Sequence, residues 1–122
     1  MGDIYYQPQN YGLRILDTIE DDSLSYEFDM LVVWQEIESD RLYWARDSGC
    51  SCPSPFEGCN AVSDLNYIHD GTIEAFEAAV NALGYGSLTE KGDLIRKVKT
   101  ALAENFREWV LMERRKAGVV NE

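Results

Sequence analysis

The most regular pattern in the chain is the run 26–37, where side chains alternate as in a half-buried β-strand. One parity of this run is apolar and largely aromatic, consisting of Tyr26, Phe28, Met30, Val32 and Trp34. From Leu31 to Val33 the other parity is apolar as well. We therefore expect a central strand that is covered on both faces.

Two weaker patterns flank this run and predict neighbouring strands. The apolar parity of the first, residues 13–19, consists of Leu13, Ile15 and Ile19. An acidic stretch at 20–23 breaks the pattern as a turn. After a short loop at 38–40, residues 41–46 form the returning strand. Three consecutive antiparallel strands predict a three-stranded meander.

The hydrophobic period becomes helical after residue 72. Thr72 is the expected N-cap of a first helix that Gly84 ends, and Thr89 is expected to cap a second helix that Gly118 ends. The second helix carries a long apolar stripe of Leu94, Ile95, Val98, Leu102, Phe106, Trp109 and Val110. Packing of such a face stabilises most helices, so we expect it to cover the sheet. The fold class is therefore α+β: a small antiparallel three-stranded meander followed by two helices, with the long C-terminal helix packed on the sheet.

The predicted organisation is an N-terminal arm at 1–12, pinned by tyrosines, and a single α+β domain at 13–122. A second helix of about 25 residues is longer than a small sheet needs. Its distal part, around Trp109 and Met112, is therefore expected to project, where it would form a homodimer or dock on a partner.

Charge is unevenly distributed along the chain, whose net charge is −11. Residues 1–88 hold 16 acidic and 3 basic residues, whereas residues 89–122 hold 6 acidic and 8 basic ones. Because nucleic acids are bound largely through Lys and Arg, we expect no direct nucleic-acid binding. An acidic body is instead suited to solubility or to a basic partner, and one alternative is an anti-restriction protein that imitates DNA.

No apolar run approaches the ~18 residues of a membrane span. The N-terminal stretch also lacks the basic start and apolar core of a signal peptide. We therefore expect a cytoplasmic protein without membrane contact, in which the cysteines stay reduced.

All three cysteines lie in the stretch 47–59, "DSGCSCPSPFEGC", and they raise the question of a metal site. Zinc takes four ligands, and the candidates are Cys50, Cys52, Cys59 and the only histidine, His69. The spacing C-x-C-x6-C-x9-H differs from a common finger, which tends to begin C-x2-C. A small domain with a structural zinc is thus an alternative, and the main expectation is no cofactor. Catalysis is not expected either, because a C-x-x-C redox motif is missing and His69 is the single candidate base.

The simplest interpretation of this stretch is a stiff surface loop. Its two prolines restrict the backbone, and Phe56 is expected to anchor the loop to the core. A preorganised loop makes a good recognition surface. The expected contact residues are Tyr43, Trp44, Asp47, Cys50, Cys52, Pro53, Pro55, Phe56 and Glu57.

Three strings of this region, "YEFDMLVVW", "RLYWARDSGCSCPSPFE" and "DL" at 64–65, resemble a family of small uncharacterised proteins from phages of actinobacteria, mycobacteriophages above all. The shared run is two strands followed by D-S-G-C-S-C-P-x-P-F/W-E, and the resemblance covers about residues 5–65. Cys59 and His69 lie outside this motif, which weakens the zinc hypothesis. The resemblance implies expression inside an infected bacterium. We therefore expect a non-enzymatic protein–protein interaction module in the host cytoplasm, with a host or phage protein as its partner.

Overall fold

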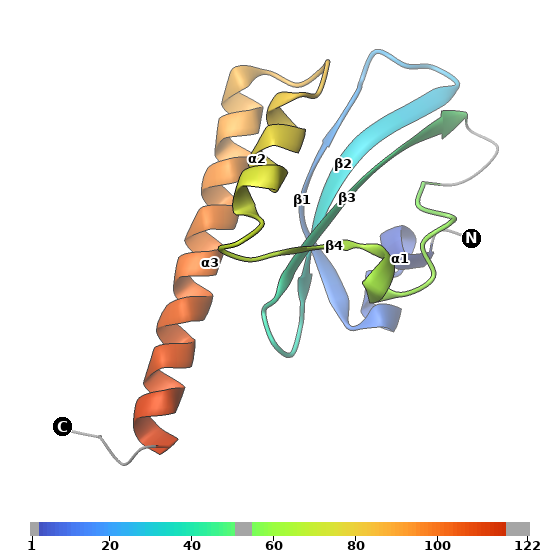
Figure 1. Cartoon of the computed structure of the whole chain (residues 1–122). Helices are drawn as coiled ribbons and strands as arrows, with labels where there is room; N and C mark the ends of the chain where they lie inside the picture. The colour runs from blue at the N-terminus through green and yellow to red at the C-terminus, as the bar shows by residue number, and fades with distance from the viewer. Residues whose placement is uncertain (1–2, 51–54, 117–122) are drawn as a thin grey trace.

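The structure, a computed structural model, describes residues 3–50 and 55–116; of Cys50 and Lys116 it describes the backbone alone. An antiparallel sheet lies between a layer of two helices and a layer made by the N-terminal segment and the loop after the third strand (Figure 1). The fold class is α+β with a long C-terminal helix, as predicted. The sheet has four strands instead of the predicted three, in the order β1 (Leu13–Glu20), β2 (Glu27–Glu36), β3 (Leu42–Cys50) and β4 (Asn66–Ile68).

The strand that the sequence analysis missed is β4, which forms one edge of the sheet beside β3. Its three residues pair with Leu42, Tyr43 and Trp44. A strand of this length is too short to show an alternating pattern. Its conformation is set by pairing with a segment more than twenty residues away in the chain.

Both faces of β2 are buried, as its sequence predicts. Leu31 and Val33 face the helices, whereas Met30, Val32 and Trp34 face the N-terminal segment. All five side chains are at most 5% exposed. The sheet therefore separates two apolar clusters, one under the helices and one under the N-terminal segment.

A β-bulge at Leu16 changes the predicted faces of β1. The register runs Ile15↔Trp34 and then Asp17↔Val33, so one residue of β1 has no partner. An extra residue shifts every later side chain to the other face. Leu13 and Ile15 therefore lie on the N-terminal side, whereas Ile19, of the same parity, packs under the helices.

The N-terminal arm packs into the core. It consists of the helix α1 (Asp3–Tyr6) and the 3₁₀ turn η1 (Pro8–Tyr11). Ile4 is fully buried, and its carbonyl accepts a hydrogen bond of 2.8 Å from Nε1 of Trp34. A buried indole N–H needs such a partner, so the arm completes the burial of β2.

The helices α2 (Ile73–Asn81) and α3 (Leu88–Lys116) cover the other face. The predicted cap at Thr89 is wrong, because α3 begins earlier in a capping box made by Ser87 and Glu90, each of whose side chains binds the other's backbone N–H at 3.0 Å. Thr72 precedes α2 as predicted. Its hydroxyl, however, donates to the Tyr67 carbonyl and accepts from the His69 N–H, tying β4 to the helix.

The link between α2 and α3 is held on the sheet by Tyr85. Its hydroxyl donates to Asp29 of β2 at 2.6 Å, and Arg46 of β3 binds the same carboxylate through two nitrogens at 3.0 and 2.9 Å. The hydrogen bonds from Arg46 hold the pKa of the Asp29 carboxyl below its usual range. Burial, and then the hydrogen bond to Asp29, raise the pKa of the Tyr85 phenol. This contact sets where α3 starts on the sheet.

The packing of the arm yields a stability prediction. Ile4→Ala should lower the free energy of unfolding by about 2–5 kcal/mol, because it leaves a cavity in a closed core. Tyr6→Ala is the control in the same short helix, since Tyr6 is 60% exposed, and should cost less than about 1 kcal/mol. Urea unfolding measures both. Equal losses for the two variants would contradict a packed arm.

Candidate interaction surface

The loop after β3 is anchored by Phe56, as the sequence predicts. This side chain is 2% exposed and packs edge-on against Trp34, with ring centroids 5.2 Å apart. The Phe56 N–H donates to a carboxylate oxygen of Asp47 at 2.7 Å. Its φ of 62° is rare for a bulky residue, and the packing and the hydrogen bond together hold it there. Asp47 and Phe56 therefore hold the loop in place.

The residues predicted to form the contact loop do not share one surface. Tyr43 and Trp44 are neighbours on β3 and point to opposite faces of the sheet: Tyr43 packs on the N-terminal side and Trp44 packs against Phe76 of α2. Pro55 is buried with Phe56, whereas Glu57 is exposed. The side chain of Cys50, together with Cys52 and Pro53, lies outside the described residues.

Two of the four predicted zinc ligands, Cys59 and His69, lie among the described side chains, and their surroundings differ. Cys59 packs against the N-terminal cluster, and burial, followed by the charges of Asp64 and Asp47, raises the pKa of its thiol. His69 is exposed, with its Nδ1 accepting from the Gly71 N–H, and it lines a hollow beside Phe106 of α3. Among the side chains that the structure describes, which exclude those of Cys50 and Cys52, no three His, Cys, Asp or Glu gather as a metal site would require.

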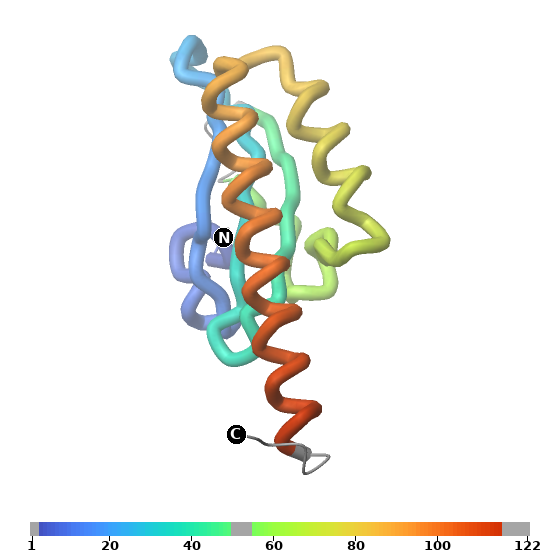
Figure 2. Tube along the Cα trace, turned by 90° about the vertical axis from the view of Figure 1, so that its left-hand side faces the viewer, coloured from blue at the N-terminus to red at the C-terminus, as the bar shows by residue number. Residues whose placement is uncertain are grey.

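Several large apolar side chains are exposed at the end of α3. Figures 1 and 2 show this helix running along the sheet and continuing past its edge. We call residues 106–116 the overhang. Phe106, Trp109 and Met112 are 61%, 56% and 51% exposed, and the rings of Phe106 and Trp109 stack with centroids 6.1 Å apart. The sequence pattern had assigned Phe106 and Trp109 to the core-facing stripe. The apolar stripe is present on α3, but it continues beyond the end of the sheet.

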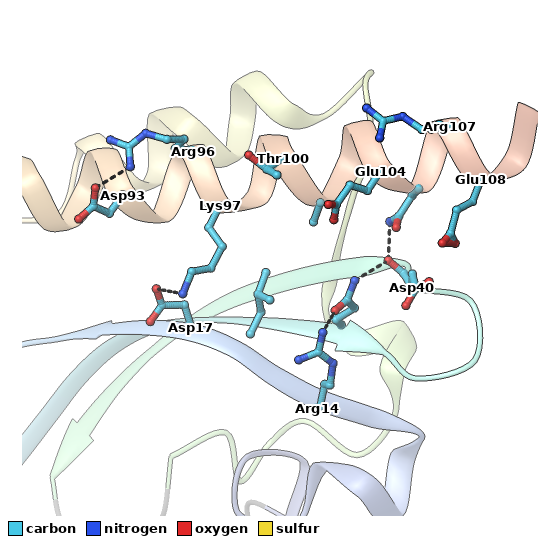
Figure 3. A pocket seen from close by; sticks show the side chains of 14 residues that line it. Arg14, Asp17, Asp40, Asp93, Arg96, Lys97, Thr100, Glu104, Arg107 and Glu108 are labelled. Carbon is cyan, nitrogen blue, oxygen red and sulfur yellow. Dashed lines mark hydrogen bonds and ion pairs between the residues drawn. The ribbon is translucent and has the colours of Figure 1, made fainter.

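A polar groove of about 1060 Å³ runs between α3 and the edge strand β1 (Figure 3). Three of its cations are bound within the chain: Lys97 pairs with Asp17 at 3.1 Å, Arg96 with Asp93 at 2.8 Å, and Arg14 donates to the buried Gln35. At the end nearest the overhang the groove is lined by Asp40, Glu104 and Glu108. Sequence reasoning missed this groove, because its two walls are 80 residues apart in the chain.

The overhang begins where α3 leaves the sheet. Asn105 donates from its side chain to the carbonyl of Asp40 in the β2–β3 turn at 2.6 Å. On the side of α3 away from the groove, Tyr67, Leu102 and Phe106 help to line a hollow of about 240 Å³. The exposed apolar face of the overhang is thus continuous with a partly apolar hollow in the body.

The family comparison matches residues 2–105 to a family described as "Domain of unknown function (DUF7574)". The chain therefore belongs to this family. No curated protein and no solved structure matches the chain. The matched region ends at Asn105, so the overhang lies outside it. Within the described part of the chain, no helix combines the length and the apolar character that a membrane span needs.

The packing of Phe56 yields a second stability prediction. Phe56→Ala should lower the free energy of unfolding by about 3–5 kcal/mol, because it empties a site between Trp34 and the N-terminal helix. Asn60→Ala, at an exposed position of the same loop, should change it by less than about 0.5 kcal/mol. Thermal unfolding followed by circular dichroism compares them. A small effect of Phe56→Ala would show that the loop is held by other contacts.

Proposed function

We propose that this protein is a non-enzymatic protein–protein interaction module whose contact surface is the overhang of α3. The observation that carries the proposal is the exposure of Phe106, Trp109 and Met112 on one side of a helix that has left its own sheet. Contiguous apolar surface of this kind usually marks an interaction site in a water-soluble protein. Aromatic residues and methionine are also enriched in protein interfaces.

Three cations of the groove are bound within the chain, which supports a non-enzymatic role. Lys97, Arg96 and Arg14 each bind a neighbour within the chain. A catalytic groove usually holds polar groups aimed at a substrate, with titrating groups shifted by burial or by a specific charge. Here Lys97 ties α3 to Asp17 of β1, Arg14 ties β1 to Gln35 of β2, and Arg96 binds within α3, so these cations serve the fold.

The place of action follows from the resemblance of the 47–57 motif to actinobacterial phage proteins. We propose that the protein works in the cytoplasm of an infected bacterium and binds a host or phage protein there. A partner that fits the overhang offers an apolar groove. Acidic side chains at its rim would complement the basic end of the helix at Arg114 and Arg115.

Capture from an actinobacterial lysate tests the contact surface with matched variants. Trp109→Glu places a charge in the middle of the exposed apolar face and should weaken partner capture by more than about 10-fold, as expected for a central aromatic contact. Leu111→Glu is the control, because Leu111 is 45% exposed on the opposite side of the same helical turn. It should capture the same proteins as the unaltered chain.

Both variants should keep the fold, because neither side chain is part of a buried cluster. Circular dichroism checks this before capture. A set of captured proteins that is the same for Trp109→Glu and for the unaltered chain would contradict the overhang as the contact surface.

A further inference from the structure

We propose that the overhang pairs with the overhang of a second copy of this chain, antiparallel and about a two-fold axis near Trp109. This inference rests on the proposed function, because it names the occupant of the same surface. Three features of the chain support this pairing: the continuation of the core stripe, the arrangement of charges about Trp109, and the acidity of the rest of the chain.

The apolar stripe of α3 keeps its direction beyond the sheet. Val98 is fully buried between α3 and the sheet, and Leu102, Trp109 and Met112 follow it by 4, 11 and 14 residues. These separations are close to whole turns of 3.6 residues. The side of α3 that binds the sheet therefore remains apolar after the sheet has ended. In an antiparallel pair centred on Trp109, Phe106 of one copy lies opposite Met112 of the other.

A second stripe on α3 carries charges of both signs. Glu108 and Arg115 follow Glu104 by 4 and 11 residues, which places all three on one side of the helix. Glu104 precedes Trp109 by five residues, and Arg115 follows it by six. Antiparallel pairing about Trp109 therefore brings Arg115 of the second copy to the level of Glu104, and the two-fold axis repeats the contact.

In this pairing, Arg115 of the second copy lies at the acidic end of the groove. Figure 3 shows Glu104, Glu108 and Asp40 at one end of the groove, which Arg107 also lines. Among the described residues no ion pair joins these three carboxylates to a cation of the same chain. Acidic residues precede Trp109 and a basic residue follows it on this side of the helix. The surface of one copy therefore complements the same surface of the other, as a two-fold interface requires.

The charge of the remaining chain favours the antiparallel direction. Residues 1–88 carry a net charge of −13, and two such bodies repel each other at short range. Antiparallel overhangs keep the bodies at opposite ends of the paired helices. Parallel overhangs would place the bodies side by side and would bring the Arg115 side chains of the two copies next to each other.

The mass in solution tests the proposal directly. Sedimentation equilibrium of the full chain under reducing conditions, from about 1 µM to about 1 mM, covers the range in which moderate dimers dissociate. We expect a mass that rises from 13.9 kDa to twice that value. A mass that remains at 13.9 kDa throughout would overturn the proposal.

Matched variants locate the contact. Met112→Glu should weaken the dimer by at least ~100-fold, because the two-fold axis buries two added charges in an apolar contact. Leu111→Gln, on the side of the helix opposite Trp109, adds no charge beside Arg115 and should leave the dimer unchanged. A dimer that survives Met112→Glu, or that Leu111→Gln disrupts equally, would overturn the assignment.

Charge reversal tests the antiparallel register. Arg115→Glu and Glu104→Arg should each weaken the dimer about 10-fold. Each variant places like charges opposite one another, and the two-fold axis repeats this repulsion at a second position. The double variant carrying both changes should recover most of the lost affinity. No recovery in the double variant would overturn the register.

The two proposals fail in different ways. If the chain is monomeric but Trp109→Glu loses a captured partner, the pairing of copies is wrong and the interaction function stands. If the chain is monomeric and Trp109→Glu captures what the unaltered chain captures, both are wrong.

Discussion

The rest of the structure depends on the central strand β2, whose two faces are both apolar from Met30 to Trp34. A strand of this kind is stable only when both of its faces are covered. The helices α2 and α3 cover one face, and the N-terminal segment and the loop fastened by Phe56 cover the other. The buried N-terminal segment and the tight loop conformation at Phe56 both follow from this requirement.

The same requirement explains why α3 has two parts with different roles. Its 29 residues extend about 44 Å at 1.5 Å per residue, whereas the ten residues of β2 extend about 33 Å. The first part of the helix is needed as a cover and is fixed by Tyr85 at its start and by Asn105 at the β2–β3 turn. The overhang has no strand beneath it, so its apolar side stays exposed.

Local patterns in the sequence predicted the elements that are stabilised locally. The strand around Met30, the helical stripe of α3 and the anchoring role of Phe56 are examples, because alternation and 3.6-residue spacing report which face is buried. The elements that depend on distant partners were missed. The edge strand β4 exists through its pairing with β3, and the bulge at Leu16 follows from the register with β2.

The candidate surface was only partly predictable for a related reason. Composition shows that aromatic residues are present, but it does not show which of them are buried: Phe106 follows the core stripe of α3 and is nevertheless exposed. Helix length was the one useful indicator, because a helix longer than its sheet must project. The groove along β1 has no signature in the sequence, since each of its walls is an ordinary amphipathic element.

Hydrogen–deuterium exchange along α3, measured at low and at high protein concentration, tests the division of this helix most directly. Amides of residues 94–102 should be protected at both concentrations, because they are packed on the sheet. Those of the overhang should exchange rapidly in dilute solution and slow down when copies associate. An overhang that is as protected in dilute solution as residues 94–102, or whose exchange is independent of concentration, would contradict a free apolar face that pairs between copies.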